Sequence, residues 1–268
     1  MTDSSNLHRN LAPVTEAAWE QIGEEAARTF KRHVAGRRVV DVAGPIGYSY
    51  SAHNLGRVRS IAASDTRIRA QIREVHPLVE LRFPFTLSRA EIDDVARGSL
   101  DSDWQPVKDA AKAIAFAEDR TVFAGFAEAG IEGLGPSSSN PTLPLPEDPL
   151  LVPDAVASAL SALRLAGVEG PYSVVLDADT YTAVSETRDE GHPVFHHLKD
   201  LVDGDIIWAP AVTGGYVLST RGGDNQLTLG ADLSIGYDSH TADSVTLYLE
   251  ESLTFSSLTA EAAVVLGR

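Results

Sequence analysis

Residues 202–237 constrain the fold more than any other stretch, because short strand signals alternate there with turn residues and no reactive constellation interrupts them. The runs D-I-I-W, G-Y-V-L-S, Q-L-T-L and L-S-I-G-Y are rich in β-branched and aromatic residues, and prolines and glycines separate them. Residues 221–268 continue this pattern, with turns at Gly222-Gly223 and Gly230. We therefore predict a C-terminal part made mostly of strands, without a catalytic constellation.

The charge balance limits the partners of the chain. It carries 22 basic and 38 acidic residues, a formal net charge of -16. Nucleic acids and anionic membranes are bound through basic surfaces, so we expect neither as a partner. The chain has no cysteine, which excludes disulfides and zinc–thiolate sites and is typical of a reducing compartment. No positively charged and apolar leader and no apolar run of roughly 18 residues occur, so we expect a cytoplasmic protein.

Helical periodicity marks the N-terminal half. Residues 12–34 predict an amphipathic helix with Thr15 as N-cap. Its apolar stripe comprises Trp19, Ile22, Ala26, Phe30 and Val34. A short helix follows Ser88 and ends at Gly98, and the longest helical signal covers residues 105–129. The inner face of that long helix comprises Ile114, Ala117, Val122 and Phe126.

The remaining segments indicate how the chain is organised. Residues 45–83 contain two polar, weakly alternating runs, and a two-stranded ribbon of this kind is marginal by itself. Either an intramolecular sheet covers it or it is an extended arm that lies on a neighbouring subunit. Residues 77–88 predict a strand near a sheet edge. The proline-rich loop 133–149 predicts a junction, after which residues 150–220 form a small α/β unit.

Catalytic and metal-binding patterns are weak. His196, His197 and Asp200 cannot readily hold one ion, because adjacent helical side chains diverge and the remaining pair supplies two ligands. The sequence contains no G-x-S-x-G, Walker A or G-x-G-x-x-G pattern, and we interpret R-G-G-D-N at residues 221–225 as a hairpin turn. Trp19, Trp104 and Trp208 lie in unrelated segments without a basic stripe, so we expect no nucleotide-stacking platform. We predict that the protein is not an enzyme and uses no cofactor.

Several segments in order resemble the shell proteins of encapsulin nanocompartments, the linocin-type family 1. They are N-L-H-R-N-L-A-P-V-T-E-A-A-W near the start, G-R-R-V-V-D-V-A-G-P at residues 36–45, F-T-L-S-R-A-E-I-D-D-V-A-R-G, D-S-D-W-Q-P-V-K-D-A-A-K, E-G-P-Y-S-V-V-L and the stretch 202–237. The resemblance covers essentially the whole chain and implies an α+β, HK97 phage-capsid-like fold. It implies a peripheral domain (residues 1–44, 84–135 and 221–255), an extended loop (45–83) and an axial domain (136–220 and 256–268).

The resemblance also implies the partners. Subunits of this family form closed icosahedral shells, here about sixty copies with T=1 symmetry. Such shells enclose a dye-decolourising peroxidase or a ferritin-like protein, whose C-terminal peptide docks on the inner wall. The matching positions in this chain are Phe30, Val34, Arg37, Val39, Asp41, Leu233, Ile235 and Tyr237. The apolar members would form a groove while Arg37 and Asp41 fix polar groups of the peptide, and the alternative is that the apolar members pack in the subunit's own core.

The resemblance places residues 185–194 at the fivefold axis, with Glu190, Gly191 and His192 nearest the opening. A ring of five Glu190 and five His192 side chains would favour small cations and respond to pH near neutrality. The alternative is a solvated turn without a function.

Two other functions compete with that of an encapsulin shell. A phage major capsid protein would share the fold. A bacteriocin-like secreted protein or a hydrolase is a weaker alternative, because no catalytic set or cationic membrane-active helix is present.

Overall fold

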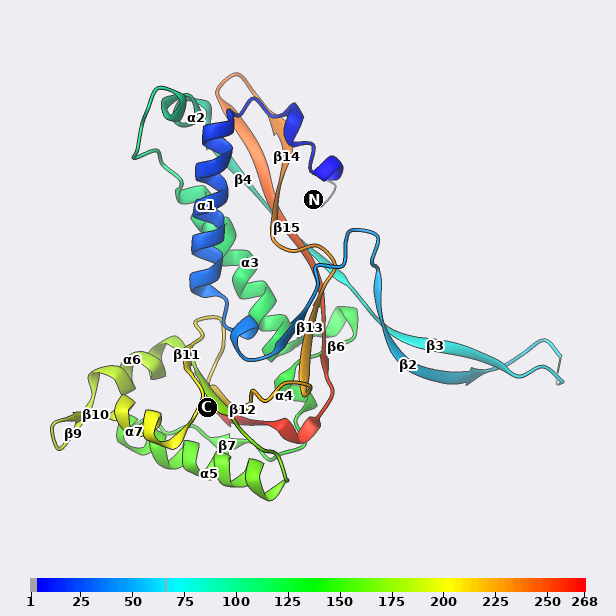
Figure 1. The fold of residues 1–268 in the computed structure, drawn as a ribbon, viewed down its shortest axis with the longest axis vertical. Helices are drawn as coiled ribbons and strands as arrows, with labels where there is room; N and C mark the ends of the chain where they lie inside the picture. The colour runs from blue at the N-terminus through cyan, green and yellow to red at the C-terminus, as the bar shows by residue number, and fades with distance from the viewer. Residues whose placement is uncertain (1–3, 66) are drawn as a thin grey trace.

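The structure, a computed structural model, describes residues 4–65 and 67–268 and consists of two sheet-based regions with one long projecting hairpin (Figure 1). Helices and sheets together make a mixed α+β fold, as predicted. Two short 3-10 helices, η1 (Ser4–Leu7) and η2 (Arg9–Leu11), begin the described chain. They pack against strand β14 (Ser234–His240), where Leu7 is buried.

The first sheet is organised around one long strand, β15 (Ser244–Ser257). Its strand order is β1-β13-β15-β14, and β4 pairs with the other edge of β15. The other strands of this sheet are β1 (Asp41–Ala43), β4 (Val79–Ser88) and β13 (Asn225–Leu229). β4 is antiparallel to β15 from Ser88↔Ser244 to Val79↔Leu253. Since β15 is the one sheet partner of β4 among the described strands, β4 is an edge strand, as predicted.

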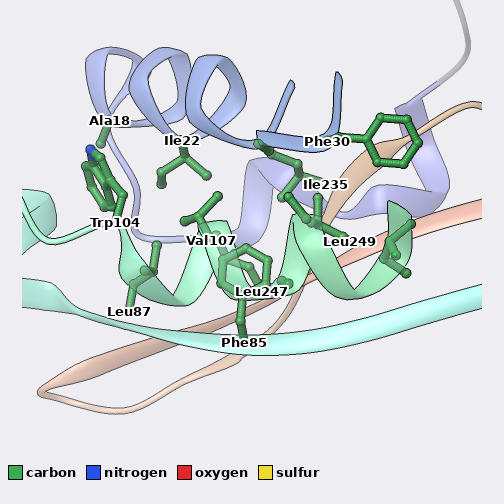
Figure 2. Packing of buried hydrophobic residues seen from close by; sticks show 14 of the residues in the cluster. Ala18, Ile22, Phe30, Phe85, Leu87, Trp104, Val107, Ile235, Leu247 and Leu249 are labelled. Carbon is green, nitrogen blue, oxygen red and sulfur yellow. The ribbon is translucent and has the colours of Figure 1, made fainter. Parts of the chain in front are cut away.

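Helix α1 (Glu16–His33) follows from its cap and its apolar stripe. The Thr15 hydroxyl accepts a hydrogen bond from the Ala18 N–H at 3.3 Å, which satisfies one unpaired donor of the first turn. Ile22, Ala26 and Phe30 are buried, so the predicted stripe faces the core. Figure 2 shows this stripe above α3 (Gln105–Phe123), which in turn lies above β4 and β15. The short helix α2 (Arg89–Ala96), capped by Ser88, closes the same core.

Helix α3 ends at Phe123, six residues before the predicted end at residue 129. Gly125 has φ +90°, and a Cβ there would lie 2.6 Å from the Ile131 carbonyl oxygen, so the chain leaves the helix where only glycine fits. Phe126 therefore lies in a two-residue strand and is half-buried, while Ile114 and Val122 face the core as expected. The segment continues through β5 (Gly125–Phe126), η4 (Ala127–Ala129), β6 (Ile131–Glu132) and α4 (Leu134–Ser137).

The second sheet has the order β11-β8-β12-β16-β7. Its strands are β7 (Leu143–Pro144), β8 (Tyr172–Leu176), β11 (Ile206–Trp208), β12 (Gly215–Ser219) and β16 (Ala263–Gly267). Its helices are α5 (Val152–Leu165), α6 (Ala178–Glu186) and α7 (Val194–Leu201), with η5 (Pro149–Leu151) and η6 (Ala260–Ala262) as short additions. β16 lies between β12 and β7, so the C-terminal segment completes the unit predicted at residues 150–220.

The connection through residues 220–224 joins the two sheets. β12 belongs to the second sheet and β13 to the first, so the prediction of a hairpin at residues 221–225 is wrong. Arg221 pairs with Asp224 at 2.9 Å, and the Asp224 carbonyl accepts hydrogen bonds from two backbone N–H groups that follow β15. A buried cluster that includes Phe123, Ile207 and Phe255 spans both sheets and joins them through one core.

The predicted arm is an antiparallel hairpin of β2 (Ala52–Ile61) and β3 (Ala70–Pro77) that projects from the body (Figure 1). Within the described chain, these strands pair only with each other. Val58 is 53% exposed and Ile72 46% exposed. The hairpin therefore joins neither sheet of its own subunit, which leaves the alternative of an arm that another surface covers.

Candidate functional site

Three of the eight residues expected in a peptide groove, Phe30, Val34 and Arg37, line one groove at the end of α1. Phe30, Val34 and Ile235 are members of one buried cluster, and Leu233 and Tyr237 on or beside β14 pack against it half-buried. Figure 2 shows Phe30 at the end of the α1 stripe, near Ile235. An open groove of about 610 Å³ lies beside Phe30 and Val34. It is lined by Phe30, Lys31, Val34, Arg37 and Arg38, whereas Leu233, Ile235 and Tyr237 are not among its lining residues.

Arg37 borders this groove but is bound inside the subunit. Its Nε lies 2.9 Å from Glu118, its Nη1 2.7 Å from Asp232 and its Nη2 3.2 Å from Glu251. Its guanidinium carbon lies 4.8 Å from the centre of the Phe30 ring. Burial lowers the pKa of Arg37, but hydrogen bonds and charge from Glu118 outweigh it and raise the pKa above the usual range. Arg37 therefore holds the groove wall in place and has little capacity left for a peptide.

The two glutamates under Arg37 were not predicted as functional residues. The side chains of Glu118 and Glu251 are both 0% exposed. Burial, followed by the Glu118 charge, raises the pKa of Glu251 well above its usual range. The sequence contained a signal for Glu118, because it lies four residues from both Ile114 and Val122 on the predicted inner face. Nothing in the pattern of β15 distinguished Glu251.

Asp119 fixes the turn η3 (Gly36–Arg38), which carries Arg37. Its carboxylate accepts hydrogen bonds from the backbone N–H groups of Ala35 at 3.0 Å and Gly36 at 2.8 Å. Burial raises the pKa of Asp119 to about 7, although these two donors favour the charged form.

Val39 and Asp41 lie outside the groove. Val39 is 4% exposed and packs in the cluster that joins the two sheets, because the chain turns inward after η3. The Asp41 carboxylate accepts a hydrogen bond from the Gly223 N–H at 2.6 Å, on the connection between the sheets. The structure therefore does not place these two residues where Phe30 and Ile235 meet.

The residues expected at a pore form the tip of a small hairpin. Strands β9 (Arg188–Asp189) and β10 (His192–Pro193) pair antiparallel. Glu190 and Gly191 connect them with φ of 46° and 90°, the left-handed backbone of a tight two-residue turn. Glu190, Gly191 and His192 are all exposed at one extremity of the molecule (Figure 1).

The neighbouring histidines do not form a larger cluster. His197 Nδ1 lies 4.0 Å from Asp189 Oδ2, while His196 is exposed. Across the described residues, no group of three or more His, Asp or Glu side chains is arranged to hold a metal ion. Among the helices of residues 4–65 and 67–268, none combines the length and apolarity needed to cross a membrane.

Comparisons with known proteins establish the family. The family described as "Encapsulating protein for peroxidase" matches residues 4–254. A type 1 encapsulin shell protein of Mycobacterium tuberculosis is 62% identical over 263 residues, which cover 98% of this chain and 99% of that protein. A type 1 encapsulin shell protein of Rhodococcus erythropolis is 58% identical over 263 residues, which cover 98% of this chain and 100% of that protein. The chain belongs to the encapsulin shell proteins.

Solved structures place this encapsulin in the phage-capsid fold. A virus-like particle protein from Pyrococcus furiosus superposes with a TM-score of 0.66 at 15% identity, covering 92% of this chain and 98% of the other. A chain from the capsid of Myoviridae phage XM1 gives a TM-score of 0.52 at 13% identity, and the match covers 87% of this chain and 90% of the phage chain. The fold is thus HK97-like, as expected. As an encapsulin, the chain is a structural shell protein and not an enzyme.

Proposed function

We propose that this encapsulin assembles into a closed cytoplasmic shell of about sixty copies with T=1 symmetry. The projecting hairpin β2–β3 carries the proposal. It exposes apolar side chains, pairs with no other strand in the described chain and is marginal as an isolated ribbon. Contact with a neighbouring subunit would cover these side chains and give the ribbon the support that its own subunit lacks.

The shell would enclose a protein whose C-terminal peptide docks in the groove at Phe30 and Val34. The family description, which names a peroxidase, favours a dye-decolourising peroxidase over a ferritin-like protein. The groove is apolar at Phe30 and Val34 and basic at Lys31 and Arg38, which suits an apolar peptide with an acidic group. Weak docking would suffice, because an oligomeric cargo engages several sites at once.

Co-expression tests the groove. The full chain would be produced with a fluorescent protein that ends in the C-terminal peptide of a dye-decolourising peroxidase. Changing both Lys31 and Arg38, which line the groove, to Gln should leave particle mass unchanged and lower the enclosed fluorescence several-fold, because the acidic group of the peptide loses its cationic partners. Leu165→Ala, at a residue 89% exposed on α5, is the matched control. Equal loading of the double variant and the control would rule out this groove.

We also propose that the β9–β10 tips surround an opening at the fivefold axis. Five copies of Glu190 would then form an acidic ring that favours cations. Glu190→Gln should slow the quenching of an enclosed dye by a small cation and leave quenching by a neutral molecule unchanged. Identical cation entry in both shells would remove Glu190 from the route.

A further inference from the structure

A second cleft lies between α1 and α3, away from the peptide groove. Its volume is about 540 Å³, within the range of small-molecule sites. At about 3.6 residues per turn, Arg28 and Arg32 lie on the other side of α1 from Phe30. The cleft is lined by Arg28, Arg32 and His33 of α1, by Lys108 and Lys112 of α3 and by Trp208 of β11.

The cleft concentrates positive charge in a chain whose net charge is -16. Arg28 pairs with Glu25 on its own helix. In the described chain, no carboxylate oxygen lies within 4.0 Å of a cationic nitrogen of Arg32, Lys108 or Lys112. Two carboxylates, those of Glu25 and Asp109, also line the cleft, and the Asp109 carboxylate accepts a hydrogen bond from the Gln105 amide at 2.8 Å.

The position of these cations does not favour folding of the subunit alone. Arg28 and Arg32 are four residues apart on α1, as are Lys108 and Lys112 on α3, and like charges at this spacing repel. Arg32 lies in the last turn of α1, where it complements the helix dipole. Lys108, in contrast, lies near the positive N-terminal end of α3, where the dipole disfavours a cation. A bound polyanion would offset the repulsion within each pair and the unfavourable dipole at Lys108.

Aromatic rings form one end of the cleft. The His33 ring lies 5.8 Å from Trp208 and 6.0 Å from Phe116, and Lys112 Nζ lies 5.3 Å from the centre of Phe116. Trp208 therefore lines a cleft together with basic residues, although no basic stripe surrounds it in the sequence. The basic residues come from two helices distant in sequence and meet the end of β11 only in the folded chain.

We propose that this cleft binds an oligophosphate group, carried by a free oligophosphate or by a nucleoside triphosphate. A chain of phosphates presents several anionic oxygens and can span the arginine row of α1 and the lysine row of α3. Arginine contacts phosphate through its planar fork and lysine as a point charge. A nucleotide would in addition stack its base on Trp208.

Titration of the assembled full-length protein tests the proposal. Tripolyphosphate, ATP and inorganic phosphate are added separately while heat and tryptophan fluorescence are recorded. We expect saturable binding of one tripolyphosphate or ATP per subunit, weaker binding of inorganic phosphate, and affinity that falls as salt rises. Tighter binding of ATP with quenching that disappears in Trp208→Phe assigns the site to nucleotides. Equal affinities for ATP and tripolyphosphate, without quenching of the tryptophan fluorescence, assign the site to free oligophosphate.

A charge variant supplies the control. Changing both Lys108 and Lys112 to Gln should lower the affinity at least tenfold with unchanged particle mass, whereas Lys199→Gln, at an exposed position of α7, should leave the affinity unchanged. Absence of saturable binding, or equal affinity of the double variant and the wild type, overturns the proposal. If the double variant loses cargo and the wild type binds no phosphate compound, the cleft serves an acidic segment of the cargo instead, and the proposal is wrong.

Discussion

Arg37 connects four parts of the subunit at the scale of a single side chain. It is on η3, and its partners lie on α3, on β15 and just before β14. Two of these partners, Glu118 and Glu251, are fully buried. The guanidinium offsets the charge of Glu118 and donates a hydrogen bond to Glu251, whose raised pKa favours the protonated form. The peptide groove depends on this cluster, because Arg37 covers Phe30.

Arg37→Met should therefore destabilise the protein strongly. The change leaves buried carboxylates without a cation, which typically lowers the free energy of unfolding by about 3–5 kcal/mol. Arg38→Met is the matched control, because Arg38 is half-exposed and its 3.7 Å ion pair with Asp205 is worth about 1 kcal/mol or less. Guanidinium unfolding curves, followed by tryptophan fluorescence, measure the stability of both variants. Similar midpoints for the two variants would contradict this role of Arg37.

Asp119 makes stability depend on pH. Its pKa is about 7 in the folded protein against an ordinary value of 3.8, because it is buried. The folded state therefore binds the proton more tightly, so this stabilisation is complete below about pH 4 and is lost as pH rises through about 7. At about 1.4 kcal/mol per pKa unit, the effect is on the order of 4 kcal/mol.

Asp119→Asn isolates this contribution from that of Glu251, whose pKa is shifted in the same direction. The amide oxygen can still accept from Ala35 and Gly36, but it does not titrate. The stability advantage of the wild type over the variant should shrink as pH rises from 4 to 8. A difference that stays constant over this range would show that Asp119 keeps an ordinary pKa in the folded protein.

At the scale of elements, the hairpin β2–β3 separates folding from assembly. Changing both Val58 and Ile72 to Ser removes exposed apolar area and touches no core residue. The circular dichroism spectrum should stay unchanged, because the subunit still folds, while the particle fraction in size-exclusion chromatography falls several-fold. The loss of each apolar side chain weakens every contact between subunits by about 1 kcal/mol. Normal shell yield, equal to that of Leu165→Ser, would show that the hairpin does not hold neighbours together.

Elements with local signals could be predicted from the sequence. The Thr15 cap and the stripe from Ile22 to Phe30 define α1, and the alternation in residues 77–88 defines β4. The end of α3 could not be predicted, because helical spacing continues to Phe126 and only the close approach of residues 131–133 to Gly125 stops the helix. The connection at residues 220–224 has the composition of a hairpin turn. It crosses between the sheets because β12 and β13 pair with strands that are distant in sequence and belong to different sheets.

At the scale of the whole molecule, the fold was predictable through the family resemblance, and the candidate sites only in part. The resemblance pointed to three residues that line the groove, Phe30, Val34 and Arg37. It could not show that Arg37 is already bound by carboxylates from other elements, or that Val39 turns into the core. The basic cleft has no local sequence signal, because three elements contribute to it.

The mass of the assembled particle tests the central claim most directly. The full chain, expressed alone, would be measured by light scattering, with negative-stain imaging of the same fraction. About sixty subunits of 28.6 kDa give a mass of about 1.7 MDa. We predict uniform hollow particles of that mass. A stable monomer or dimer would contradict the shell, and a larger uniform particle would contradict the T=1 count.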